Sequence, residues 1–115
     1  MRIVSQSNLS SAHGRILAHV GQDRAWKDGY SDFARRLPGL IQVSGLIQAA
    51  LFVESRRGAP ERQLLKDLSY VLLDNEALLT QLKDMDAQQY RAVTARAQQA
   101  LVIFKRLSAS MLGDA

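Results

Sequence analysis

Few residues in this chain have the types and spacing that catalysis or metal binding requires. The two histidines, His13 and His19, are six positions apart, whereas two metal ligands on one helix face are usually four apart. The chain has no cysteine, which excludes disulfides, thiolate nucleophiles and sulfur ligands. Asp84 and Asp86 are placed like helix caps rather than like an acid–base pair. We therefore expect no catalytic residue, no metal site and no cofactor.

Basic side chains are the remaining candidates for a functional site. Fifteen Lys and Arg face eleven Asp and Glu, and most of the basic residues are Arg, which binds phosphate with two parallel hydrogen bonds and stacks on bases. No base-reading motif accompanies them, so bound nucleic acid would be held through phosphates without sequence preference. A solvated surface is the competing interpretation. The candidate phosphate contacts are Arg24, Lys27, Arg35, Arg36, Arg56, Arg57, Arg62, Lys66, Arg91 and Arg96.

Aromatic residues near the first basic positions could stack on bases. Trp26, Tyr30 and Phe33 follow one another at spacings of four and three, which is the spacing of one helix face. This pattern favours a core stripe over an exposed stacking platform.

Hydrophobic periodicity predicts an all-α, compact bundle of five or six helices with a long C-terminal helix, forming a single domain over residues 1–115. Asp28 or Ser31 is expected to cap the second helix, and Asp74 or Asn75 the short one. An extended leader is expected over residues 1–8. The predicted helices cover residues 11–24, 28–37, 38–53, 60–73, about 78–82, and 87–111. Within 38–53, Gly45 marks either a bend or a place where another helix packs closely.

The most apolar run, LPGLIQVSGLIQAALFV at residues 37–53, lies at the centre of this pattern. Pro38 favours the first turn of a helix, so we expect a helix end near Leu37 and a new start or a kink there. Residues 46–53 are apolar on nearly every side, which predicts a helix surrounded by others. Neither this run nor the N-terminus has the length and composition of a membrane span or a signal peptide, so a cytoplasmic location is expected.

Several short segments resemble the small subunit of the type III-B CRISPR effector, the Cmr complex. The matching residues read FARRLP at 33–38, LIQ at 40–42, GL at 45–46 and QAALF at 48–52. The segment 90–107, with its Tyr, Arg and late FKR, is similar to the last helix of that family. Ser44 stands where the family often has Asn before the Gly, which affects a local bend more than the fold.

The resemblance implies a non-catalytic, all-helical subunit that acts in antiviral defence. In that family, copies stack head to tail as a minor filament beside the backbone subunits, and reactions belong to the backbone and large subunits. The implied partners are other Cmr subunits, further copies of this chain and the guide RNA–target RNA duplex, with no membrane. The resemblance assigns no RNA contact, because its motifs are core sequence.

Two other function classes remain open from the residues alone. One is a helical protein-interaction adaptor whose Arg residues serve solubility and pairing. The other is a small DNA-binding regulator, which would prefer duplex DNA and bind as a dimer.

Overall fold

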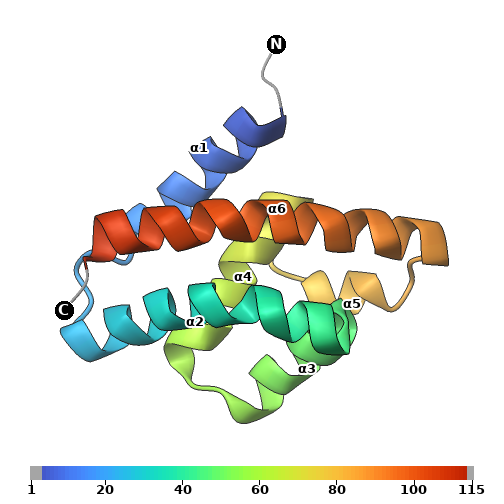
Figure 1. Ribbon diagram of the computed structural model, residues 1–115, viewed down its shortest axis with the longest axis horizontal. Coiled ribbons are helices and arrows are strands. Elements are labelled where there is room, and N and C mark those ends of the chain that lie inside the picture. Colours follow the sequence, from blue (N-terminus) through green and yellow to red (C-terminus); the bar gives the residue numbers. More distant parts are fainter. Residues whose placement is uncertain (1–3, 114–115) are drawn as a thin grey trace.

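Every regular element in the described part of the chain, residues 4–113, is a helix in this computed structural model (Figure 1). This confirms the all-α bundle and its long C-terminal helix, which has 26 residues. The described helices are α1 (Val4–Leu17), α2 (Arg24–Ser44), α3 (Leu46–Arg56), α4 (Ala59–Leu73), α5 (Leu78–Leu82) and α6 (Ala87–Leu112).

Helices α2, α4 and α6 form the centre of the bundle. Figure 1 shows α2 and α6 running side by side along the long dimension, with α4 crossing behind them, and each pair among the three is in contact. α1 lies across α4 and α6, and α3 packs on α2 and α4. The largest fully buried side chains come from all six described helices, and Tyr30, Leu64 and Phe104 are examples from the three central ones. Burial of these apolar stripes is the main force that holds the helices together.

Helix α2 differs from the prediction because it runs unbroken through Pro38, from Arg24 to Ser44. Its N-cap is Asp23, whose Oδ1 accepts a hydrogen bond of 2.8 Å from the Trp26 amide, so the predicted caps further along were wrong. Leu37 and Ile41 lie on the same buried face on either side of the proline. Packing of this face outweighs the hydrogen bond that proline removes.

Helix α1 begins and ends earlier than the periodicity predicted. It covers Val4–Leu17, so residues 4–8 are helical rather than extended, and residues 1–3 of the predicted leader lie outside the described residues. Asn8, Ala12 and Ile16 recur every four residues on its buried side. The chain then turns over residues 18–23, although periodicity predicts that the helix continues through them.

Gly45 separates α2 from α3. Its φ of 84° and ψ of 160° belong to a region that only glycine adopts freely, and its N–H donates to the Ile41 carbonyl at 2.7 Å. The predicted bend is confirmed. However, α3 is not surrounded by other helices, because Leu51 and Phe52 are 44% and 38% exposed.

The later helix ends follow local sequence signals closely. Pro60 stands in the first turn of α4. Asp86 and Gln89 form the predicted capping box at the start of α6, with hydrogen bonds of 2.7 and 3.0 Å. The N-cap of α5 is Ala77 instead of Asp74 or Asn75, although Asn75 Oδ1 accepts from the Ala77 amide at 2.9 Å.

Two glycines only six residues apart should respond oppositely to alanine. Gly45→Ala should lower the free energy of unfolding by about 1–3 kcal/mol, because of its backbone conformation. Its new Cβ would also lie 3.3 Å from the Tyr90 hydroxyl oxygen. Gly39→Ala, inside α2 with nothing within 4 Å, should raise this free energy by about 0.5–1 kcal/mol. Urea denaturation measures both, and equal effects would contradict the assigned helix break.

Candidate nucleic-acid interface

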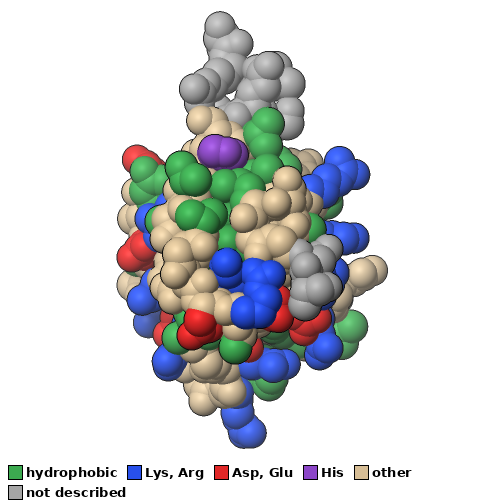
Figure 2. Space-filling model, turned by 90° about the vertical axis from the view of Figure 1, so that its left-hand side faces the viewer, with side chains coloured by type: hydrophobic (Ala, Val, Ile, Leu, Met, Phe, Trp, Pro, Cys, Tyr) green, Lys and Arg blue, Asp and Glu red, His purple; other side chains and the backbone are tan. Residues whose placement is uncertain are grey.

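The ten candidate phosphate contacts are spread over four helices rather than gathered at one site. On the end of the molecule where α2 begins and α6 ends, Lys and Arg side chains alternate with Asp and Glu (Figure 2). The candidates lie on α2 (Arg24, Lys27, Arg35 and Arg36), at the end of α3 (Arg56 and Arg57), on α4 (Arg62 and Lys66) and on α6 (Arg91 and Arg96).

The candidate residues on α2 already have protein partners. Arg35 and Arg36 share one carboxylate, that of Asp32, at 3.2 and 2.9 Å. Arg24 lies 3.6 Å from the Asp28 carboxylate and donates to the Leu112 carbonyl, which ties α2 to the end of α6. Lys27 donates to the Val20 carbonyl at 3.3 Å. Because these ion pairs are exposed, they hold the side chains only weakly and leave net positive charge on α2.

Arg57 and Arg96 have structural contacts that the sequence did not reveal. The Arg57 guanidinium lies over the rings of Phe33 and Phe52, 5.3 and 5.4 Å from their centroids. This cation–π contact joins α2 to α3 and partly covers Phe52. Arg96 donates to the Leu72 carbonyl at 3.0 Å and so satisfies the end of α4.

Three of the candidate residues lie close together where α3 ends and α4 begins. Arg62 and Lys66, one turn apart on α4, line a hollow of about 360 Å³ together with Glu54, Ala59 and Gln63. Arg56, the exposed last residue of α3, lies just before this turn. Among the described residues none of these three cations forms an ion pair. We call Arg56, Arg62 and Lys66 the α3–α4 basic face.

The N-terminus of α4 lies at the α3–α4 basic face, and Glu61 in its first turn offsets part of its positive charge. Arg62 lies in the first turn of this helix, whose N-cap, Gly58, has no side chain to satisfy the free amides. Helix N-termini carry partial positive charge and favour phosphate. The face can therefore bind a phosphate by charge without reading a base.

A buried carboxylate, that of Asp67, connects α1, α2 and α4. The sequence predicts that Asp67 lies largely off the apolar stripe of α4, which is formed by Leu64, Leu65, Leu68, Val71 and Leu72. That prediction is wrong, because the residue is 0% exposed. Oδ1 accepts from Arg15 Nε and Gln63 Nε2, both at 2.9 Å. Oδ2 accepts from the Tyr30 hydroxyl at 2.5 Å and from His19 Nε2 at 2.7 Å. These five residues form the Asp67 cluster.

The Asp67 cluster keeps its carboxylate ionised. Burial alone would raise the pKa of Asp67, but hydrogen bonds from His19, Tyr30, Gln63 and Arg15 outweigh it and lower this pKa. Burial and the adjacent Asp67 charge raise the pKa of Tyr30 well above its ordinary value. Tyr30 therefore stays protonated and donates its hydrogen bond at neutral pH.

Trp26 and Tyr30 stack on each other in this cluster rather than offering a platform for bases. Their ring centroids are 5.4 Å apart at an interplanar angle of 17°, and the His19 ring lies 5.0 and 5.2 Å from them. Tyr30 and Phe33 are buried, which confirms the core interpretation of this stripe. One available sequence signal was the spacing of Arg15 and His19, four residues apart. Another was the place of Asp67 between apolar Leu65 and Leu68.

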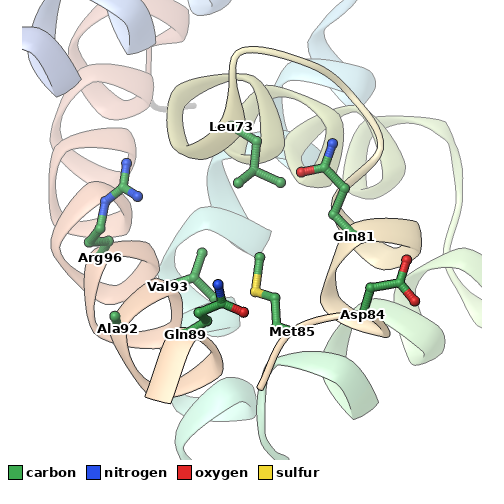
Figure 3. A pocket seen from close by; sticks show the side chains of 8 residues that line it. All are labelled: Leu73, Gln81, Asp84, Met85, Gln89, Ala92, Val93 and Arg96. Carbon is green, nitrogen blue, oxygen red and sulfur yellow. The ribbon is translucent and has the colours of Figure 1, made fainter. Parts of the chain in front are cut away.

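A second hollow, of about 470 Å³, lies between α4, α5 and α6 (Figure 3). Leu73, Met85 and Val93 give it an apolar floor, and Asp84 and Arg96 stand on opposite sides. A lone carboxylate without a nearby base or nucleophile gives no catalytic arrangement. Within residues 4–113, no group of three or more His, Asp or Glu could hold a metal ion. No helix in this range is long and apolar enough to cross a membrane.

Comparison with known proteins identifies the family. The model of the CRISPR-associated protein (Cas_Cmr5) family matches residues 4–111. The chain belongs to the Cas_Cmr5 family. It is 33% identical over 117 residues to a Thermus thermophilus protein named CRISPR system Cmr subunit Cmr5, covering 99% of this chain and 100% of that protein.

The fold of the Cas_Cmr5 family is also shared. The crystal structure of a CRISPR-associated Cmr5 family protein from Thermus thermophilus superimposes with a TM-score of 0.85 and 28% identity. The superposition covers 97% of this chain and 99% of that one. These matches confirm the family that residues 33–52 and 90–107 resembled.

The Asp67 cluster predicts a specific dependence of stability on pH. Because the folded state lowers the pKa of Asp67, its contribution is present above the unfolded pKa of about 3.9 and is lost as pH falls through the folded value. Asp67→Asn should lower the free energy of unfolding by about 3 kcal/mol at pH 7, and the difference from wild type should shrink below about pH 4.

Asp74→Asn is the matched control for this experiment. It removes the same charge from an exposed left-handed position at the end of α4, where Asn is well tolerated. Urea denaturation from pH 7 to pH 3 compares the three proteins. An Asp67→Asn deficit that stays constant down to pH 3 would show that the ionised carboxylate is not what stabilises the fold.

Proposed function

We propose that this chain is a non-catalytic small subunit of a type III-B CRISPR ribonucleoprotein, the Cmr complex, and supports guide RNA–target RNA binding in antiviral defence. The observation that carries the proposal is the Cas_Cmr5 family match over residues 4–111. The Thermus thermophilus relative, which the chain matches from end to end, is named as a Cmr subunit. Its partners would be the backbone and large subunits and further copies of itself, stacked head to tail as a minor filament.

The chemistry of the described surface supports a binding role rather than a catalytic one. Asp67, the carboxylate whose pKa is lowered, is buried and accepts four hydrogen bonds, so it cannot reach a substrate. Neither histidine belongs to a reactive arrangement in the part of the chain that the structure describes, since His19 binds Asp67 and His13 is exposed on α1 with no described hydrogen-bond partner. Such a protein contributes contacts and position, and reactions would belong to other subunits.

RNA contact would be made by charge, and the α3–α4 basic face is its best-supported position. Arg56, Arg62 and Lys66 are exposed and project from consecutive helices beside the N-terminus of α4. Arg35 and Arg36 supply a weaker second position because they share Asp32. None of these residues is arranged to read a base edge, so binding would follow the phosphate backbone without sequence preference.

Charge reversal on the α3–α4 basic face tests the RNA contact. Arg62→Glu with Lys66→Glu should weaken binding to an RNA duplex by at least about tenfold at about 50 mM salt, because each lost phosphate contact also loses counterion release. The slope of log K against log salt should become shallower by between about 1 and 2. Fluorescence anisotropy over a salt series, with duplexes of unrelated sequence, measures both quantities.

Lys83→Glu with Lys105→Glu is the matched control, since it changes net charge equally at exposed positions, just after α5 and on α6. An equal loss of RNA affinity in both double variants would mean that RNA binding depends only on net charge and not on the α3–α4 basic face. Stronger binding of duplex DNA than of duplex RNA would favour a DNA-binding regulator instead.

Purification from the native host tests membership in the complex separately. A tagged full-length chain should co-purify with other Cmr subunits and with guide RNA. Recovery of unrelated proteins without RNA would favour a protein-interaction adaptor and contradict the proposal. The same eluate, separated by size, should contain assemblies with more than one copy of this chain.

A further inference from the structure

We propose that α1 can detach as one unit from α4 and α6 while α2–α6 stay folded. Asp67 is the latch that holds α1 in place. The Asp67 cluster is buried, and the proposed RNA contact gives it no role. The proposal follows from how unevenly apolar and polar contacts are divided between α1 and the rest of the bundle.

The apolar attachment of α1 is small. Among its described side chains only two hydrophobic ones, Ala12 and Ile16, belong to the buried core. Leu9 and Leu17 on its outer side are 47% and 53% exposed. By contrast, the longer α6 contributes six hydrophobic side chains to the same core, including Leu101 and Phe104. Because apolar stabilisation scales with buried area, α1 depends less on the core than the central helices do.

The turn that follows α1 also carries an exposed apolar side chain. Val20 is 44% exposed, close to the exposure of Leu9. Figure 2 faces the end of the molecule where α2 begins, and hydrophobic side chains gather there beside a histidine. In Figure 1, α1 projects from the bundle. Undocking would add Ala12 and Ile16 to this surface.

The sequence of α1 also gives it little helical stability of its own. Its 14 residues, VSQSNLSSAHGRIL, contain four Ser, one Asn and one Gly, all weak helix formers. Its first turn has no acidic residue to favour the helix dipole. An isolated helix of this length and composition is unstable in water. Once undocked, α1 should therefore lose its helical hydrogen bonds, which makes undocking measurable.

The polar attachment is concentrated on one carboxylate. Arg15 Nε and His19 Nε2, from α1 and the turn after it, each bind one oxygen of Asp67. Arg15 also pairs with Glu76 and lies 4.7 Å from the centre of the Tyr70 ring. The described side-chain hydrogen bonds that Arg15 and His19 make to the rest of the bundle thus converge on α4 and the loop after it.

Asp67 keeps other partners when α1 leaves. The Tyr30 hydroxyl from α2 and Gln63 from α4 itself still donate to its two oxygens. Water entering the vacated space can replace the other two bonds. The carboxylate thus avoids the penalty of an unpaired buried charge, so α2–α6 can stay folded while α1 is away.

The connection between α1 and α2 permits this movement. Residues 18–23 form a series of turns whose backbone hydrogen bonds are local, such as His19 N to Ile16 O at 2.8 Å. Gly21 is in open space, since a Cβ added there would meet nothing within 4 Å. Asp23 anchors the far end of the segment as the N-cap of α2, so motion would stop there.

Amide hydrogen exchange of the full chain, followed by mass spectrometry at neutral pH, tests the latch. Arg15→Gln removes one latch bond from a partly exposed side chain and should leave the protein folded. It should speed exchange of α1 amides by at least about tenfold, and these amides should exchange faster than those at the centres of α2, α4 and α6, because undocking exposes them without global unfolding. Asp67→Asn should act in the same direction and more strongly on α1.

Ser69→Ala is the control on the same helix. It removes the bond of 2.7 Å from Ser69 Oγ to the Asn75 carbonyl, a buried polar contact that involves no residue of α1. Ser69→Ala weakens α2–α6 whether or not α1 is docked, so it should leave the exchange of α1 amides at the wild-type rate while it speeds exchange at the centre of α6. The proposal is overturned if α1 amides exchange no faster than those at the centre of α6, or if Ser69→Ala speeds α1 as much as Arg15→Gln does.

Discussion

A carboxylate shut away from water stays ionised only when enough donors surround it, and Asp67 has four. These donors come from α1 and its following turn, from α2 and from α4, so one side chain fixes three segments that are far apart in sequence. Apolar packing alone would let these helices slide, since it has little directionality. The Asp67 cluster sets their register, and the stacked rings of Trp26 and Tyr30 close it on the α2 side.

Around the Asp67 cluster, the bundle is held by the packing of apolar helix faces and by unusual backbone positions such as Gly45. α2 and α6 lie side by side, and α4 crosses both. Gly45 ends α2 and lets α3 fold back, where the Ile47 amide donates to the Tyr90 hydroxyl of α6 at 3.0 Å. Arg57 and Arg96, two of the predicted phosphate contacts, are partly engaged in holding helices together.

Arg56, Arg62 and Lys66, which form the α3–α4 basic face, are predicted phosphate contacts without an ion pair among the described residues. The difference between the held and the free basic residues has a physical reason. An Arg that lies over aromatic rings or binds a carbonyl is held to the protein, whereas Arg62 and Lys66 project beside a helix N-terminus. These exposed cations are the basis on which we propose that this Cas_Cmr5 family member supports RNA within a larger assembly.

The sequence by itself determined the helical class, the long C-terminal helix, the Asp86 capping box, the bend at Gly45 and the family. Each of these rests on residues close together in the chain, where periodicity and capping act directly. The tertiary structure decided what depends on distant partners. Burial of Leu37 and Ile41 carries α2 through Pro38, against the local preference of proline. The local pattern places Asp67 largely off the apolar stripe of α4, but hydrogen-bond donors 37 to 52 residues away in the sequence hold it in the core. Which Arg residues stay free was decided in the same way, because a cation's partners are set by the packing of helices and not by its neighbours in the chain.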